Sequence, residues 1–136
     1  MVNLSKLMIG DWVKTNPSCG KLACGIKSNI ARVSEIGFSN TDGMFVSFAD
    51  IKGRYYDNEV EFIQLTEEIL EKNGFKKDKD YGYFIGQSNS GYYIYLDNNY
   101  LSIQAGYDAI EFAWCEYVHE LQQALKLCGI TKSIKL

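Results

Sequence analysis

The first half of the chain consists of short runs in which apolar and polar residues alternate, separated by turn residues. In the cleanest run Met44, Val46 and Phe48 would share one face of a strand. Four or five short strands with no helical pattern between them predict a small antiparallel β-barrel or curled sheet over residues 1–64, and leave 65–136 as a second part. The predicted strands are 11–15, 30–36, 44–48 and 60–63.

A short helix is predicted to open the second part. Thr66 is a good N-cap residue, and Glu67 and Glu68 follow it where the positive end of the helix dipole favours acidic side chains. Gly74 suits the position that follows a helix end. The helix is therefore expected over 67–73, directly after the boundary between the two parts.

The segment that follows the helix predicts a three-stranded β-meander. Asn98 and Asn99 fit a two-residue hairpin loop, because asparagine tolerates the positive φ that such loops need. This loop and the earlier loop 88–91 set a register that gives the meander one consistently apolar face. The second hairpin pairs Leu96 with Leu101, Ile94 with Ile103 and Tyr92 with Ala105; the first pairs Gln87 with Tyr92, Ile85 with Ile94 and Tyr83 with Leu96.

From residue 111 the apolar period changes to that of a helix, which is predicted to run to Cys128 and to cover the apolar face of the meander. Gly129 is expected to end the helix, and the tail 130–136 to add a short edge strand. The fold class is therefore α+β: a β-barrel, then a helix, a meander and an amphipathic helix. The apolar stripe of the last helix lies within about 60° of Leu121 on a helical wheel and comprises Trp114, Tyr117, Val118, Leu121, Ala124, Leu125 and Cys128.

Composition limits the functions open to this α+β chain. It has 136 residues, of which 46% are hydrophobic, so it can bury a core and is not expected to be disordered. Lysine and arginine number 14 against 17 acidic residues, and the net charge of −3 belongs entirely to the second part. The basic excess typical of a general nucleic-acid or acidic-membrane binder is missing.

Tyrosine is the residue in clear excess, with ten copies, several of which the meander places opposite its apolar face. An exposed aromatic face can stack bases, dock a peptide or anchor a protein partner. Alternatively, the first part of the chain packs on this face and encloses the rings in one fused core. The predicted binding residues are Phe84, Tyr93, Tyr95, Tyr100 and Gln104.

Catalytic motifs are sparse. His119 is followed by Glu120 as in a zinc-protease helix, but that motif needs a second histidine where the chain has Gln123. A weaker hypothesis pairs Cys115 with His119, one helical turn apart, as a thiol–imidazole dyad. The pattern favours instead a solvated or domain-facing stripe on the helix. That stripe comprises Cys115, His119, Gln122 and Lys126. The chain has no phosphate-binding, dinucleotide-binding or serine-hydrolase motif, so we expect neither an enzyme nor a cofactor.

The cysteines are expected to be reduced thiols. Lys6 interrupts the apolar run at the N-terminus, so no signal peptide is predicted, and no run approaches the roughly 18 apolar residues that cross a bilayer. A cytoplasmic protein without a membrane partner is expected, and cytoplasmic thiols stay reduced. A zinc site would need four ligands at short spacings, so buried or incidental thiols are favoured. The cysteines are Cys19, Cys24, Cys115 and Cys128.

Two stretches of the second part resemble a family of small uncharacterised proteins of gut commensal bacteria, their phages and mobile elements. These stretches are 65–75 (LTEEILEKNGF) and 117–130 (YVHELQQALKLCGI), and the resemblance covers residues 65–136. It implies an accessory role in a phage or mobile-element setting and carries over no functional residue. Separately, the strands from Gly10-Asp11-Trp12-Val13 onward are similar to SH3-like barrels, a fold that hosts many functions.

Together these patterns predict a non-enzymatic binding or adaptor protein that contacts a protein partner through the barrel or the tyrosine face. A nucleic-acid-binding regulator is the alternative. A thiol enzyme that uses Cys115 and His119 is a remote third hypothesis.

Overall fold

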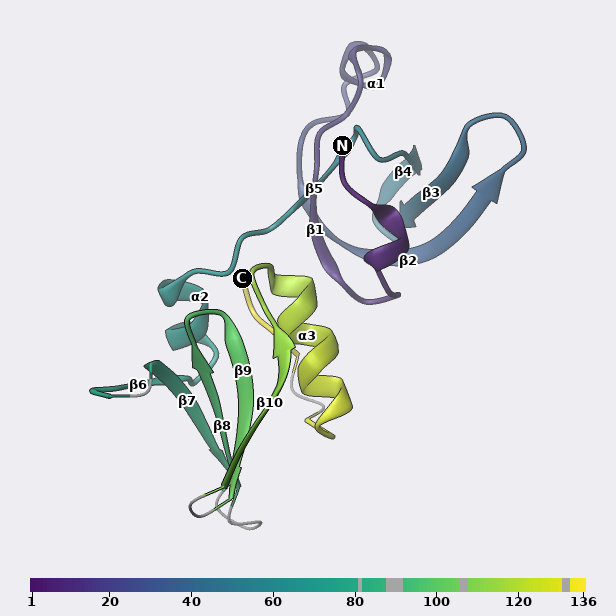
Figure 1. Ribbon diagram of the computed structural model, residues 1–136. Coiled ribbons are helices and arrows are strands. Elements are labelled where there is room, and N and C mark those ends of the chain that lie inside the picture. The colour runs from purple at the N-terminus through teal and green to yellow at the C-terminus, as the bar shows by residue number, and fades with distance from the viewer. Residues whose placement is uncertain (81, 88–91, 106–107, 131–132) are drawn as a thin grey trace. The chain divides into compact units, whose positions relative to one another are not determined.

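The computed structural model describes residues 1–80, 82–87, 92–105, 108–130 and 133–136, and within these it leaves out the side chains of 86–87, 92, 104–105, 108–110 and 112. The described chain is α+β and divides into two compact units, Met1–Ile63 (unit 1) and Gln64–Leu136 (unit 2). Each unit contains a five-stranded antiparallel sheet (Figure 1). No helix in the described part of the chain is long and apolar enough to span a bilayer.

Unit 1 is an open sheet with the strand order β4-β3-β2-β1-β5. The strands β2, β3 and β4 follow one another as a meander, and β5 returns to pair with β1. The expected barrel is therefore not closed. The elements are η1 (Leu4–Lys6), β1 (Trp12–Thr15), α1 (Cys19–Ala23), β2 (Ile30–Ser39), β3 (Gly43–Phe48), β4 (Ile51–Tyr55) and β5 (Val60–Phe62).

The long strand β2 joins the two halves of this sheet. Its beginning pairs with β1 and the rest with β3, and the register shifts between Val33 and Glu35, which marks a β-bulge. A bulge bends a strand and increases its twist, so β2 can belong to both pairings. The strand extends three residues beyond the predicted 30–36, because the hairpin with β3 continues to Ser39 and Gly43.

The core of unit 1 is a cluster of buried residues from the η1 segment and the five strands. Val46 and Phe48 are buried in it and Met44 packs against it, which confirms the predicted inward face of 44–48. The opposite face of the hairpin holds the buried Phe45, whose ring occupies the space where Gly37 would carry a Cβ. The buried core residues are Leu4, Leu7, Val13, Val33, Val46, Phe48, Tyr55 and Val60.

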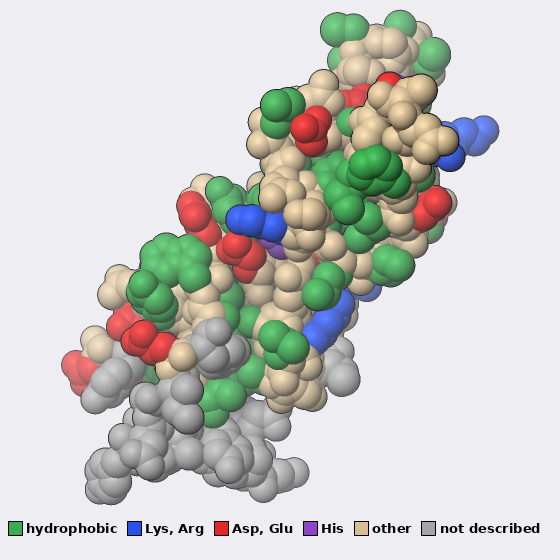
Figure 2. All heavy atoms as spheres, turned by 45° about the vertical axis from the view of Figure 1, so that its right-hand side comes forward, with side chains coloured by type: hydrophobic (Ala, Val, Ile, Leu, Met, Phe, Trp, Pro, Cys, Tyr) green, Lys and Arg blue, Asp and Glu red, His purple; other side chains and the backbone are tan. Residues whose placement is uncertain are grey.

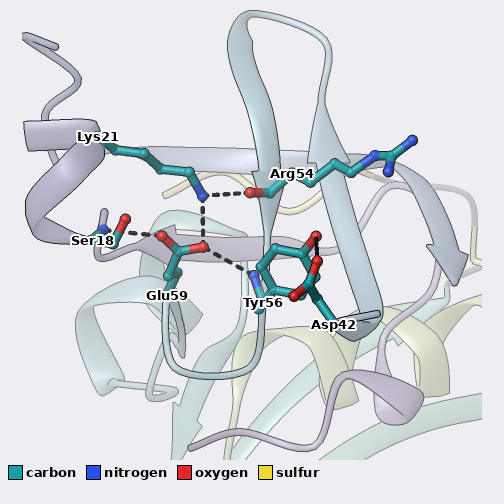
Figure 3. Close-up of polar contacts among 6 residues, drawn as sticks. All are labelled: Ser18, Lys21, Asp42, Arg54, Tyr56 and Glu59. Carbon is teal, nitrogen blue, oxygen red and sulfur yellow. Dashed lines mark hydrogen bonds and ion pairs between the residues drawn. The ribbon is translucent and has the colours of Figure 1, made fainter. Parts of the chain in front are cut away.

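The helix α1 lies between the predicted strands 11–15 and 30–36, where no helix was expected, and a polar cluster ties it to the sheet (Figure 3). The Lys21 ammonium donates to the Glu59 carboxylate at 2.6 Å and to the Arg54 carbonyl, and lies 3.9 Å from the centre of the Tyr55 ring. Glu59 also accepts from the backbone N–H groups of Ser18 at 3.0 Å and Tyr56 at 3.2 Å. One lysine thus connects β4 to the residue that precedes β5, although these two strands are opposite ends of the sheet order.

Unit 2 contains a second sheet with the order β10-β9-β8-β7-β6, and Figure 1 shows α3 running along it. Both predicted hairpin registers are confirmed in full, including Leu96 opposite Leu101 and Ile85 opposite Ile94. Asn98 and Asn99 have φ of 47° and 67°, as the two-residue loop requires. The elements are α2 (Glu67–Lys72), β6 (Lys76–Asp78), β7 (Gly82–Gln87), β8 (Tyr92–Asp97), β9 (Tyr100–Ala105), β10 (Asp108–Trp114) and α3 (Val118–Leu127).

The prediction of one helix over 111–128 is wrong at its beginning. Residues up to Trp114 belong to β10, which pairs with β9, and α3 starts only at Val118. The Glu120 carboxylate accepts from the backbone N–H groups of Glu116 at 2.8 Å and Tyr117 at 3.1 Å, so two donors at the new helix start are satisfied. The backbone N–H and C=O groups of β10 are satisfied by pairing with β9. These hydrogen bonds outweigh the preference for a helix that the apolar period of the sequence indicates.

The C-terminal tail also differs from its prediction, because its described residues form no strand. Asn73, the C-cap of α2, holds the tail through its side-chain amide instead. Its Nδ2 donates to the Lys135 carbonyl at 2.7 Å, and its Oδ1 accepts from the Lys135 N–H at 2.7 Å. A single buried side chain therefore replaces the hydrogen bonds that an edge strand would have made.

Candidate binding surface: an aromatic sheet face

The register of unit 2 places one row of residues across all five strands. Lys76 on β6 lies opposite Phe84, Phe84 opposite Tyr95, Tyr95 opposite Ser102, and Ser102 opposite Glu111. Residues directly opposite one another in antiparallel strands share a face of the sheet. The row therefore has an aromatic middle, with a lysine at one end and a glutamate at the other.

Three of the predicted binding residues form a ring cluster on this face. The ring centroids of Phe84 and Tyr95 are 5.6 Å apart, those of Phe84 and Tyr93 are 6.2 Å apart, and those of Tyr93 and Tyr95 are 6.3 Å apart. Aromatic pairs at these separations attract one another beyond simple area burial. The three rings therefore form one cluster on this face.

A second aromatic pair joins Tyr100 to Trp114, with ring centroids 4.7 Å apart and planes at 84°. The sequence prediction missed Trp114 because it placed this residue on the helix. A β-bulge decides its orientation: the β9–β10 register shifts between Glu111 and Ala113, which puts Trp114 opposite Tyr100. Without this shift in register, Ala113 rather than Trp114 would lie opposite Tyr100.

The two faces of the sheet differ sharply in exposure. On the inner face Leu101 is fully buried and Ile94 is 3% exposed. On the other face Tyr93 is 46% exposed, Tyr100 47% and Trp114 48%. Figure 2 draws one side of the molecule, on which hydrophobic and acidic side chains reach the surface next to one another. We call the outer side the aromatic face; it comprises Phe84, Tyr93, Tyr95, Tyr100 and Trp114.

For one predicted binding residue, Gln104, the structure places only the backbone. The backbone of Gln104 pairs with that of Tyr93, so residue 104 lies directly opposite one member of the ring cluster. The side chain of Gln104 lies outside the described residues. Charged residues stand at the border of the aromatic face, and Lys76, Asp97 and Glu111 are all exposed.

The structure contradicts a solvated stripe at Cys115, His119 and Gln122. Cys115 precedes α3 rather than lying on it, and both Cys115 and His119 are fully buried. Burial, with smaller contributions from Glu120 and Cys128, raises the pKa of the Cys115 thiol to about 12. A nucleophilic cysteine needs a lowered pKa, because the thiolate is the reactive form. The geometry therefore gives no support to a thiol–imidazole dyad.

The other three cysteines differ in position and in exposure. Cys19 and Cys24 are exposed at the two ends of α1, and Cys128 is partly buried at the end of α3. Within the ranges that the structure describes, no group of three or more histidine, cysteine or acidic side chains is arranged to hold a metal ion.

Comparison of the chain with protein-family models, with curated proteins and with solved structures finds no match.

Proposed function

We propose that this chain is a non-enzymatic binding or adaptor protein that docks a protein partner on the aromatic face of unit 2. The observation that carries this proposal is the half-exposure of Tyr93, Tyr100 and Trp114 on a sheet whose other face is buried. Tyrosine and tryptophan dominate the energetics of protein interfaces, because each offers a large apolar area with few rotatable bonds and a polar end.

The charges around the aromatic face favour a partner with an apolar centre and a basic border. Asp97 and Glu111 stand beside the rings against one lysine, Lys76. Residues 65–136 carry ten acidic residues and seven lysines, so the surrounding field is negative. Complementary charge at the border of an interface raises the rate of association and suppresses wrong partners.

A nucleic-acid-binding regulator is the second candidate, since aromatic rings on a sheet face can stack single-stranded bases. Such a surface also needs lysine and arginine along the path of the phosphates. The acidic balance of residues 65–136 weighs against this requirement.

The proposal also covers the arrangement of unit 1, the biological setting of the protein and its location in the cell. The strand order of unit 1, in which β5 returns to β1 beside the β2–β3–β4 meander, supports an SH3-like arrangement. An accessory role in a phage or mobile element is supported by the resemblance of residues 65–136 alone. The proposal also includes a cytoplasmic location, where the free cysteines of the described chain would stay reduced.

The test is the double substitution Tyr93→Ser and Tyr95→Ser. A partner captured from the native host and then purified should bind the double variant at least about tenfold more weakly than the wild type, because two central rings are lost. Phe38→Ser is the matched control: Phe38 lies in unit 1 and is 77% exposed, so binding should not change. Affinity is measured by isothermal titration and folding by circular dichroism.

Two outcomes contradict the proposal. If the double variant is unfolded, the rings belong to a core and the aromatic face is not a binding site. If binding to the double variant is unchanged, the partner docks elsewhere. A captured nucleic acid whose binding weakens steeply between low and high salt supports the second candidate instead.

A further inference from the structure

Unit 1 contains two adjoining hollows that share part of their lining. The first has a volume of about 320 Å³ and the second about 550 Å³, and both are lined by Asn29, Asp50 and Ile51. The walls come from the start of β1, the start of β2, the turn between β3 and β4, and the segment that follows α1. We call this surface the Trp12 groove, after the one tryptophan in its wall.

The first hollow is largely apolar. Trp12, Ala31 and Ile51 are partly buried along it, and the buried Phe48 also contributes to its wall. A volume of about 300 Å³ is at the lower end of ligand pockets, so this hollow suits one or two side chains rather than a whole cofactor.

The border of the groove is cationic. Lys27 and Lys52 line the second hollow and both are exposed. The Arg32 guanidinium lines the first hollow and lies 4.7 Å from the centre of the Trp12 ring. Asp50 is the one acidic residue among the lining residues of the two hollows. Three cations against one carboxylate make the groove positive within a chain whose net charge is −3.

We propose that the Trp12 groove binds a short acidic peptide segment, with one apolar side chain in the first hollow and carboxylates directed toward Lys27 and Lys52. Charge complementarity indicates an acidic segment as the ligand, because the positive groove attracts such a segment and the negative remainder of the chain repels it. The size of the first hollow supports a single apolar side chain as the anchor, because the hollow is too small for more than one or two side chains. This site uses no residue of the aromatic face, and it gives the adaptor a second ligand.

The two tryptophans of the chain allow a direct test, because one lines the groove and the other lies on the aromatic face. In the full-length variant Trp114→Phe, Trp12 is the single tryptophan and its fluorescence reports on the groove. The probe is an acetylated and amidated peptide of about eight residues, glutamate and serine around one leucine, which spans about 26 Å when extended.

The acidic peptide should change the Trp12 emission saturably and bind about tenfold more tightly than a peptide with lysine in place of glutamate. Its binding should weaken as salt rises from about 20 mM to about 300 mM, because exposed charges are screened. Replacing the leucine with serine should weaken binding as well, since the apolar anchor is lost. Equal binding of the acidic and basic peptides, or no change in emission with the acidic peptide at low salt, overturns the proposal.

A charge-reversal pair locates the site. Lys27→Glu with Lys52→Glu should weaken binding of the acidic peptide by about tenfold or more. Lys126→Glu with Lys135→Glu changes the net charge equally at exposed positions of unit 2 and should have little effect. Equal losses in both double variants would mean that net charge alone drives binding, which contradicts a site at the groove.

The Tyr93→Ser, Tyr95→Ser variant separates this inference from the proposed function. Peptide binding that persists in that variant, together with loss of the protein partner, supports both sites. Loss of peptide binding in the folded variant places the peptide on the aromatic face and overturns the groove proposal while the proposed function stands.

Discussion

Single residues decide how α1 is held in unit 1. Lys21 is partly exposed and its partner Glu59 is buried, with side-chain exposures of 20% and 6%. By contrast, the ion pair of Lys14 with Glu61, at 3.2 Å, is about half exposed at both ends. A buried carboxylate that loses its cation stays desolvated without compensation, whereas an exposed one is solvated by water. The same substitution at the two lysines should therefore have very different costs.

Lys21→Met should lower the free energy of unfolding by about 2–3 kcal/mol, because it leaves the Glu59 carboxylate buried and unpaired. Lys14→Met, the matched control, should cost less than about 1 kcal/mol. Urea unfolding followed by circular dichroism measures both. Equal losses in the two variants would show that the Lys21 pair is no more stabilising than a surface pair.

The same carboxylate makes stability depend on pH. Burial acts to raise the pKa of Glu59, but hydrogen bonds from Lys21, Ser18 and Tyr56 outweigh burial and lower the pKa below its ordinary value. A carboxyl with a lowered pKa stabilises the fold above the pKa of the unfolded chain, and this contribution is lost as the pH falls through the folded pKa.

Unfolding free energies measured between about pH 6 and pH 3 should therefore fall more steeply in the wild type than in Glu59→Gln, which cannot titrate at this position. Glu61→Gln, the same change at a carboxylate that is about half exposed, is the matched control. A Glu59→Gln variant with the wild-type acid dependence would contradict the role given to this carboxyl.

At the level of elements, the accuracy of the sequence predictions follows the strength of the local signal. The β7–β8–β9 registers could be predicted because a shift by one residue would move every apolar side chain to the wrong face. β6 gave no signal, since its sequence Lys-Lys-Asp has no alternation, and α1 is held by the distant Glu59. β10 was missed because a short apolar run fits both periods, and only the pairing with β9 selects the strand.

The hairpin between β8 and β9 offers a test at this scale. Asn99 has φ of 67°, so Asn99→Val should cost about 1–2 kcal/mol, because a β-branched residue is strained in the left-handed region. Asn99→Gly should be neutral or slightly stabilising, since glycine adopts this conformation freely. The Asn99 carbonyl, which accepts from the Cys115 N–H at 2.7 Å, is present in all three proteins. Thermal unfolding should rank valine below asparagine and glycine; a valine variant equal to the glycine variant would contradict this.

At the scale of the whole molecule, the α+β class could be predicted, but the sequence could not decide whether the first sheet closes into a barrel or stays open. Strand number and spacing are the same for a curled sheet and a barrel, and closure depends on whether the two end strands pair. Here Lys21 connects the Arg54 carbonyl of β4 to Glu59, next to β5, through an inserted helix rather than a ladder of backbone hydrogen bonds. The aromatic face was predicted in large part, because four of its five rings lie on strands whose register was clear.

The ring of Phe45 against Gly37 has a consequence for how this sequence can vary in nature. The two residues are directly opposite one another on β2 and β3, and a Cβ at position 37 would collide with the ring. The Arg54 guanidinium lies over the same ring at 4.3 Å. A larger residue at position 37 is thus tolerated only after the side chain at position 45 has become smaller. If the Phe45 ring is lost first, the fold persists, and positions 37 and 54 no longer have to accommodate the ring. Among descendants of this chain, positions 37 and 45 should therefore change together, and in that order.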